Sequence, residues 1–231
     1  MKFITANMKN QEKFDTSADT TVFLAGPITF APDWQIKFFD NLIRYYHDNS
    51  DKGSNKITVY SPRWIIPGSY DNLDECFTFL KLLSKKDNLD DSPFDMQKQY
   101  DWESYHLKAV DIVVFGFVPY VGEPKFDRSY ARTTRIELGE AIGRNYALKE
   151  YQEDLPYNQE ILVYKDKDYT DDKDGYIDLK VRENGFVCTS DWNEIFDIIL
   201  SKTKRNVEDF NELKLQVRGV DAYGYADKYN Q

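Results

Sequence analysis

The stretch Asp111-Ile-Val-Val-Phe-Gly-Phe117 decides the fold class. Its side chains are apolar without alternation, which is typical of a central strand that is buried on both faces of a parallel sheet. A second apolar stretch, Thr21-Val-Phe-Leu-Ala-Gly-Pro-Ile28, ends in a glycine and a proline. This pattern indicates a buried strand that runs into a tight turn. We therefore expect both stretches to be strands of one sheet.

Strand and helix patterns alternate on either side of these two stretches. Asp33 is placed to cap a helix whose apolar residues recur near helical spacing from position 34 onward. Strand patterns are also found at 56–60, 160–164 and 185–188, and helix patterns at 95–108, at 134–148 and from Asp191. Such alternation predicts an α/β fold, with a parallel sheet that helices cover on both faces. In sheets of this kind, ligands bind beyond the carboxyl ends of the strands.

The 231 residues are expected to form one main domain. This domain spans 21–203 and carries an insertion at about 63–97, where neither the helical nor the strand period fits well. We expect a polar lead-in at 1–20 and a C-terminal extension at 204–231, because neither segment has a period that indicates an element.

Composition excludes several classes of protein. Lys and Arg number 30 against 40 Asp and Glu, so the formal net charge is −10. A nucleic-acid polymer is not an expected partner, since phosphate binding needs a basic face. The 41% hydrophobic and 16% aromatic content excludes a disordered acidic chain. No apolar run is long enough to span a membrane and the first 20 residues lack an apolar signal core, so we expect a cytoplasmic protein without a membrane partner.

Several kinds of catalytic site are disfavoured as well. Cys76 and Cys188 lie far apart, and the chain has only two histidines, His47 and His106, so neither a zinc site nor a histidine-based triad is well supported. The GxGxxG, GxxxxGKS/T and GxSxG motifs are absent. We therefore expect no metal and no organic cofactor, and carboxylates remain as the candidates for chemistry.

Two carboxylates stand out by their positions. Glu137 follows Thr134 at the spacing of a capping box, in which the carboxylate would only bond back to the start of its own helix. Glu103 lies on the helix before the strand at 111–117, where a solvated helix carboxylate is the simpler interpretation. Taken together, however, both helix ends can point into the same crevice of a doubly wound sheet. Paired carboxylates suit glycosyl transfer, in which one attacks or stabilises the sugar carbon and the other handles the proton of the leaving group.

Four pieces of sequence carry a resemblance to a known family, in the expected order. They are Val22-Phe-Leu-Ala-Gly-Pro-Ile28 with Trp34 downstream, Tyr60-Ser-Pro62, Trp102-Glu103 leading to Asp111-Ile-Val-Val-Phe115, and Thr134-x-x-Glu137-Leu-Gly139. With them the chain resembles the nucleoside 2-deoxyribosyltransferase family, which also includes 2'-deoxynucleoside 5'-phosphate N-hydrolases. The four pieces cover roughly residues 21–148.

The resemblance implies both a fold and a reaction. The family's fold is a doubly wound, five-stranded, mostly parallel sheet with flanking helices, of the Rossmann or flavodoxin type. Glu137 matches the family's nucleophile, which attacks C1' of the deoxyribose, expels the base and holds the sugar covalently. Glu103 matches the carboxylate that contacts or protonates the base. The motif residues that would bind the substrate are Gly26, Pro27, Ile28, Asp111 and Thr134.

The chain also departs from the family pattern. Three arginines, Arg128, Arg132 and Arg135, precede Glu137 where the family often has small residues, and Asp127 lies further from Glu137 than a third family carboxylate should. The arginines form either a solvated face or a binding site for a 5'-phosphate, for which guanidinium is the natural partner. Arg63 is a weaker candidate for the same phosphate.

These observations lead to one preferred function and two alternatives. The preferred function is an enzyme that cleaves the N-glycosidic bond of a 2'-deoxynucleoside and passes the sugar to another nucleobase. The first alternative is an N-glycoside hydrolase that acts on a deoxynucleoside or its 5'-monophosphate. The second is a non-catalytic module that binds a nucleotide on the same fold. By resemblance, the expected partners are a nucleoside or nucleotide, a nucleobase and further copies of this chain in a homo-oligomer.

Overall fold

The structure is a computed structural model that describes residues 1–8, 14–15, 17–49, 56–64, 85, 89, 93–122, 130–151, 159–169 and 175–202. Its centre is one sheet of parallel strands: β1 (Lys2–Thr5), β2 (Thr20–Ala25), β3 (Ile57–Ser61), β4 (Ile112–Phe117), β5 (Glu160–Lys165) and β6 (Val187–Thr189). The strands lie in the order β1-β3-β2-β4-β5-β6. Without β1, the order of the other strands is the flavodoxin-like order, and β1 extends the sheet beyond β3 at one edge.

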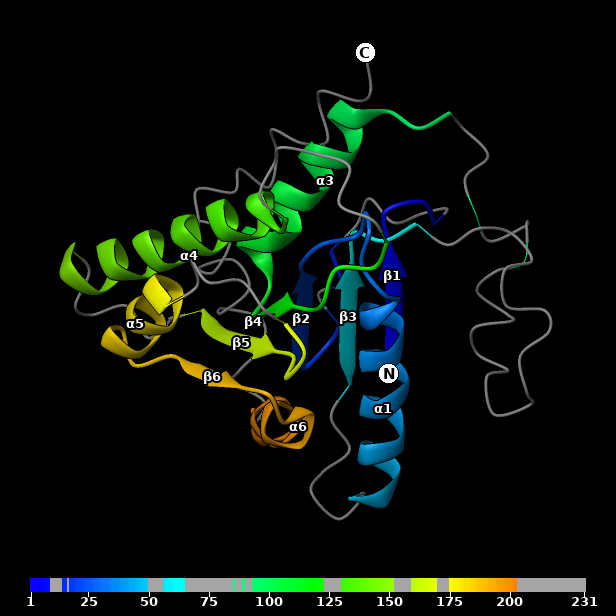
Figure 1. The fold of residues 1–231 in the computed structure, drawn as a ribbon. Coiled ribbons are helices and arrows are strands. Elements are labelled where there is room, and N and C mark those ends of the chain that lie inside the picture. Colours follow the sequence, from blue (N-terminus) through cyan, green and yellow to red (C-terminus); the bar gives the residue numbers. More distant parts are fainter. Residues whose placement is uncertain are drawn as a thin grey trace.

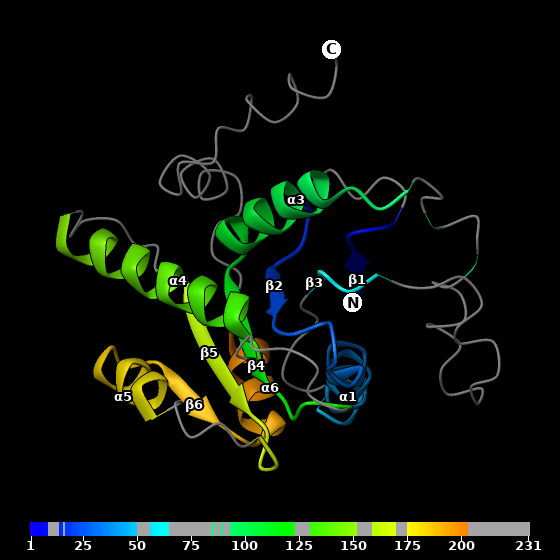
Figure 2. The ribbon, with the colours of Figure 1, turned by 45° about the horizontal axis from the view of Figure 1, so that its top comes forward.

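Helices cover both faces of the sheet (Figures 1 and 2). One face carries α1 (Trp34–Asp48) and α6 (Trp192–Ser201), and the other carries α3 (Met96–Ala109), α4 (Arg132–Tyr151) and α5 (Gly175–Glu183). The side chains of β2 alternate between the two layers: Val22 and Leu24 pack in the core under α1 and α6, and Phe23 and Ala25 pack in the core under α3 and α4. Each layer therefore has its own apolar core.

The predicted α/β fold is confirmed, and every strand expected from the sequence is present. The expected count of five strands is wrong, because β1 adds a sixth. The first residues of the expected lead-in at 1–20 therefore belong to the sheet, where Phe3 is buried and Lys2–Thr5 pair with β3. A four-residue edge strand that begins with a lysine offers too short a pattern to be recognised. Helix α5 was not expected either.

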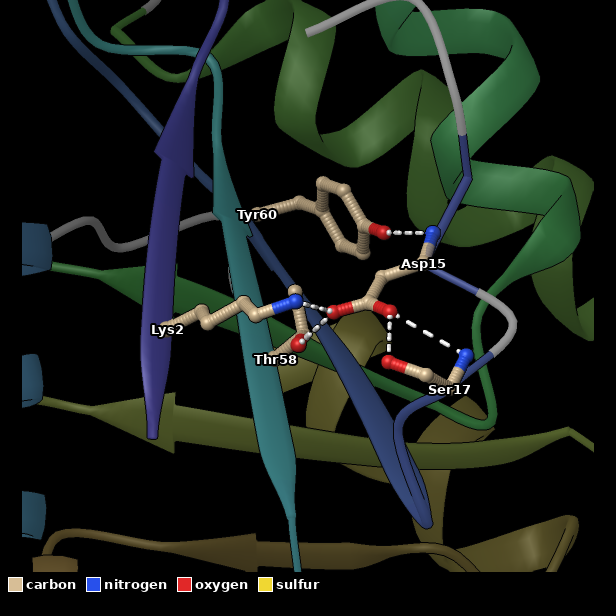
Figure 3. A network of polar contacts seen from close by, with 5 residues as sticks. All are labelled: Lys2, Asp15, Ser17, Thr58 and Tyr60. Carbon is tan, nitrogen blue, oxygen red and sulfur yellow. Dashed lines mark hydrogen bonds and ion pairs between the residues drawn. The ribbon is translucent and has the colours of Figure 1, made fainter.

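One carboxylate fastens the segment between β1 and β2 to the sheet (Figure 3). The Asp15 side chain accepts hydrogen bonds from Thr58 Oγ1 at 2.9 Å and from the Ser17 hydroxyl at 2.6 Å and backbone N–H at 3.1 Å. Lys2 Nζ lies 2.7 Å from the same carboxylate. The Asp15 backbone N–H donates to the Tyr60 hydroxyl. These donors lower the pKa of Asp15 to about 2, although burial acts in the opposite direction.

The topology places a switch point between β2 and β4. The chain leaves β2, passes through α1 to β3 on one side, and returns through α3 to β4 on the other side of β2. Ala25 at the end of β2 pairs with Phe115 near the end of β4. The segments that follow these two strands diverge, and this is where ligands bind in open α/β sheets.

Several expectations concern residues that the structure does not describe. Most of the expected insertion at 63–97 and all of the extension at 204–231 lie outside the described residues, as do Cys76, Asp127 and Arg128. Within the described part of the chain, no helix has the length and apolar character needed to cross a lipid bilayer.

Candidate active site at the carboxyl edge

A buried tryptophan fixes the turn after β2. The Trp34 ring lies against Gly26 and Gly116, and a Cβ at those positions would stand 2.5 Å and 2.6 Å from it. Any larger residue at either position would therefore collide with the ring. The indole N–H also donates to the Pro27 carbonyl at 3.2 Å. Gly26, Pro27 and Ile28, the predicted substrate-binding turn, thus lie at the switch point between β2 and β4.

Glu103 is carried by α3, whose N-terminal half reaches the carboxyl edge of β3. The Asp95 side chain caps the helix by accepting hydrogen bonds from the backbone N–H groups of Gln97 and Lys98. Trp102 is buried in the core under α3 and α4, and its neighbour Glu103 is half-buried. The interpretation of Glu103 as a fully solvated helix carboxylate is therefore wrong.

Glu137 lies in the second turn of α4, and it is not the partner of a capping box. The helix begins at Arg132, so Thr134 stands inside the first turn and does not cap the helix, and its side chain is buried. Ala131, just before the helix, has a φ of 55°, a left-handed conformation that non-glycine residues rarely adopt. Leu138 is buried against the sheet, and Glu137 beside it is half-buried.

The two carboxyl groups lie close enough to act on each other. Burial, together with the nearby charges of Glu103 and Glu140, raises the pKa of Glu137 to about 8. Burial also raises the pKa of Glu103, against the effect of a hydrogen bond from Gln99. Among the described residues, no basic group lowers the pKa of either carboxyl. At neutral pH the pair is therefore expected to hold one proton.

The hydrogen bond to Glu103 comes from a residue that sequence reasoning did not single out. Gln99 Nε2 donates to Glu103 Oε1 and also to the Pro62 carbonyl, at 3.0 Å. Trp64 Nε1 donates to Gln99 Oε1 at 2.7 Å. No motif or periodicity in the sequence marks Gln99, because it is one of several polar residues in the first half of α3.

Asp111 does not lie with the other predicted site residues. Its carboxylate accepts hydrogen bonds from the Thr21 backbone N–H at 2.8 Å and from the Thr21 hydroxyl at 2.6 Å. Both residues stand where β2 and β4 begin, which is the amino edge of the sheet. Asp111 therefore lies at the opposite edge of the sheet from Gly26 and Glu137, and the structure does not bring it together with the other predicted site residues.

The arginines predicted to bind a phosphate are arranged in three different ways. Arg135 donates one guanidinium hydrogen bond to the Tyr130 carbonyl and another to the Tyr169 hydroxyl, at 2.8 Å. Arg132, three residues earlier, is exposed. Arg63 forms an ion pair with Asp33, which therefore does not cap α1 as the sequence suggested.

A row of aromatic rings borders the same edge. Ring centroids lie 5.4 Å apart for Phe30 and Tyr120, 5.2 Å for Tyr120 and Tyr130, and 6.5 Å for Tyr130 and Tyr169. The Val121 backbone N–H donates to the Phe30 carbonyl at 2.8 Å, which ties the segment after β4 to the segment after β2. Phe30 has a φ of 56° and is 40% exposed. Non-glycine residues held in this left-handed conformation are found preferentially at functional sites.

Side chains that could bind a metal do not form a cluster in the part of the chain that the structure describes. No group of three or more His, Cys, Asp or Glu side chains there is arranged to hold a metal ion. His106 is buried in the core, where burial lowers its pKa to about 4, so its ring is neutral at physiological pH. Among the described residues, carboxyls and tyrosines are thus the groups at the carboxyl edge that can take part in acid–base or nucleophilic chemistry.

Comparisons with known proteins do not assign this chain to a family. No family model matches it, and no curated protein matches it. One solved structure with some likeness is a conserved protein from Enterococcus faecalis V583, at 13% sequence identity and a TM-score of 0.32. That likeness covers 85% of this chain and 98% of the other. At so low a TM-score it supports no conclusion about this molecule.

Proposed function

We propose that this protein cleaves the N-glycosidic bond of a 2'-deoxynucleoside and transfers the deoxyribose to another nucleobase. The observation that carries the proposal is the pair of Glu103 and Glu137, two half-buried carboxyls from different helices at the carboxyl edge of the sheet, where the charge of Glu103 helps to raise the pKa of Glu137. A pair of this kind can supply a nucleophile and a general acid at the same time.

In the proposed reaction, the Glu137 carboxylate attacks C1' and the bond between C1' and the base nitrogen breaks. The electron pair of that bond stays on the base, which receives the proton held by Glu103. The sugar remains as an ester of Glu137. An incoming base then attacks C1', Glu103 takes up the proton of that base, and the ester bond breaks. Two inversions at C1' give overall retention.

The raised pKa of Glu137 sets a condition on this mechanism. A carboxyl with a pKa of about 8 holds its proton at pH 7, and a protonated carboxyl is a poor nucleophile. Because the pair shares one proton, that proton has to pass to Glu103 when the substrate binds. The protein would then enter the reaction with an ionised nucleophile and a protonated acid, without exchanging a proton with solvent.

The pairing of the arginines favours a nucleoside over a 5'-monophosphate as substrate. A phosphate needs guanidinium groups whose hydrogen-bond donors are available. Arg63 is paired with the Asp33 carboxylate, and two donors of Arg135 are taken up by the Tyr130 carbonyl and the Tyr169 hydroxyl, so that of these three arginines only the exposed Arg132 is left for a phosphate. We therefore place the uncharged nucleoside first among the substrates, and hydrolysis of a 5'-monophosphate second.

An exchange assay tests the proposal. The protein is incubated with a 2'-deoxynucleoside, with and without a different free base, and the products are separated by chromatography. We expect a new nucleoside only in the presence of the second base. Equal amounts of free deoxyribose in both reactions would instead indicate a hydrolase. Binding of the nucleoside without any product would indicate the non-catalytic module.

Two variants accompany the assay. Glu137→Gln keeps the shape of the side chain and removes the nucleophile, so product formation should be lost. Glu194→Gln makes the same change at an exposed position in the first turn of α6 and should leave the rate unchanged. Equal activity of the Glu137→Gln variant and the wild type would exclude Glu137 as the nucleophile.

A further inference from the structure

The Gln99 side chain can adopt only one orientation in its hydrogen-bond network. The Trp64 indole N–H can only donate, so the group that faces it must be the amide oxygen of Gln99. The Pro62 carbonyl can only accept, so the group that faces it must be the amide nitrogen. Both contacts give the same assignment, and turning the amide over would break both.

This orientation determines that Glu103 accepts a hydrogen bond from an amide N–H group of Gln99. With its oxygen held by Trp64, the amide nitrogen of Gln99 has two N–H groups, one for the Pro62 carbonyl and one for Glu103 Oε1. An amide N–H favours the ionised form of the carboxyl that it contacts. No comparable donor among the described residues reaches the Glu137 carboxyl. The two members of the pair are therefore not equivalent.

We infer that Gln99 is a positioning residue that places the negative charge of the carboxyl pair on Glu103 and leaves the shared proton on Glu137 in the absence of substrate. Trp64 and the Pro62 carbonyl act through Gln99 by fixing its amide. The catalytic consequence rests on the proposed function. Gln99 stabilises the Glu103 carboxylate that remains after the proton has passed to the leaving base, so protonated Glu103 is a stronger acid.

The charged groups around the pair allow this assignment. Glu137 feels Glu103 from α3 and Glu140 from its own helix, and both are acidic. For Glu103, the effects beyond burial come from Gln99. Since no basic group in the described part of the chain biases the pair, a single well-placed amide is enough to decide which member ionises first.

A titration by NMR of carboxyl carbons tests the inference without any substrate. Glu103 is followed in a Glu137→Gln background and Glu137 in a Glu103→Gln background, so that neither titration is coupled to the other. Adding Gln99→Leu should raise the midpoint of Glu103 by about one pH unit and leave the midpoint of Glu137 unchanged. An unchanged Glu103 midpoint, or an equal rise at both carboxyls, would overturn the inference.

The chain supplies a matched control two residues earlier on the same helix. Gln97 Nε2 donates to Asp101 Oδ1 at 2.8 Å, which is the same pairing of glutamine and acid at a spacing of four residues on α3. Gln97 is exposed, so Gln97→Leu should leave the Glu103 midpoint where it is. If Gln99→Leu does not fold, Trp64→Phe replaces it. That variant keeps Gln99 but releases its amide, and the Glu103 midpoint should rise by a smaller amount. An unchanged midpoint in that variant would also overturn the inference.

The inference and the proposed function can fail separately. If the wild-type protein shows no base exchange, the proposed function is wrong, and the titration still decides whether Gln99 sets the charge on Glu103. If exchange occurs, its rate is measured as a function of pH. Gln99→Leu should shift the alkaline midpoint of this pH–rate profile to higher pH, because Glu103 then gives up its proton less readily. A rate loss without any movement of that midpoint would indicate a purely structural role.

Discussion

Two acidic sites in this molecule use the same carboxyl chemistry in opposite ways. At the amino edge of the sheet, where the strands begin, Asp15 is surrounded by donors from Lys2, Ser17 and Thr58, and its pKa falls to about 2 (Figure 3). At the carboxyl edge, Glu137 has another acid as its neighbour and no donor among the described residues, and its pKa rises to about 8. Asp15 therefore stabilises the fold as an anion, whereas ionised Glu137 opposes it.

A carboxyl that serves stability and a carboxyl that serves chemistry therefore need different surroundings. A carboxylate that is fully satisfied by hydrogen bonds is poorly suited to proton transfer or attack, because those bonds must first be broken. A half-buried acid beside another acid is costly to the fold, and such perturbed groups gather at functional sites.

The largest expected effect is on activity. Glu137→Gln should reduce the rate of base exchange by at least about a thousandfold, since removing a nucleophile commonly has an effect of this size or larger. Asp15→Asn should leave the rate per folded molecule unchanged. The measurement is the initial rate of exchange at a fixed concentration of folded protein. Comparable rate losses in the two variants would contradict the assignment of Glu137, and not Asp15, to the reaction.

The next effect is the loss of stability at Asp15. Asp15→Asn should lower the free energy of unfolding by about 1–2 kcal/mol at pH 7, because it removes charge-assisted hydrogen bonds. The folded-state pKa of Asp15 lies below its ordinary value of 3.8, so its stabilisation is complete above pH 3.8 and is lost as pH falls toward 2. Denaturant unfolding of both proteins at a series of pH values measures this. A stability difference that stays constant down to pH 2 would contradict the assignment.

The opposite sign is expected at Glu137. Its folded-state pKa of about 8 lies above the ordinary value of 4.5, so the folded protein holds this proton more tightly than the unfolded chain does. Stability is therefore lost as pH rises from 4.5 to 8. Glu137→Gln removes this loss, and its melting temperature should exceed that of the wild type by a few degrees at pH 8.5 and match it at pH 4.5. A variant that melts below the wild type at pH 8.5 would show that ionised Glu137 stabilises the fold.

The smallest effect is expected at the edge of the Asp15 cluster. Lys2→Met removes one of the donors to Asp15, but the Lys2 side chain is 62% exposed, so solvent and salt screen its charge. The free energy of unfolding should fall by about 0.5 kcal/mol at low salt. The difference should shrink at high salt, which urea unfolding in two buffers can show. A loss as large as that of Asp15→Asn would mean that Lys2 alone accounts for the low pKa of Asp15.

The sequence was sufficient for the parts of the fold that depend on long apolar runs. Strands β2 and β4 are buried over their whole lengths, and such runs are visible without any structure. Strand β1 was missed because pairing with β3 decides its structure, and four residues carry too little pattern to indicate it. The start of α4 was placed two residues late, and that error made the capping box at Thr134 look plausible.

The candidate site was only partly accessible from the sequence. Glu103 and Glu137 were identified because motifs mark them, and the structure places them close enough to act on each other. The hydrogen bonds of Asp111 to Thr21 at the amino edge were not foreseen, since Thr21 is distant in sequence. Gln99 was overlooked because its role depends on Trp64 and Pro62, which reach it only through folding.

Intact-mass spectrometry tests the sugar-transfer mechanism most directly. The protein is mixed with a series of 2'-deoxynucleosides without an acceptor base, quenched in acid, and digested for peptide mapping. We predict a mass increase of one deoxyribosyl group, located on Glu137 and absent from the Glu137→Gln variant. An adduct on any other residue, or product formation by the wild type with no adduct at any quench time, would contradict the covalent role of Glu137.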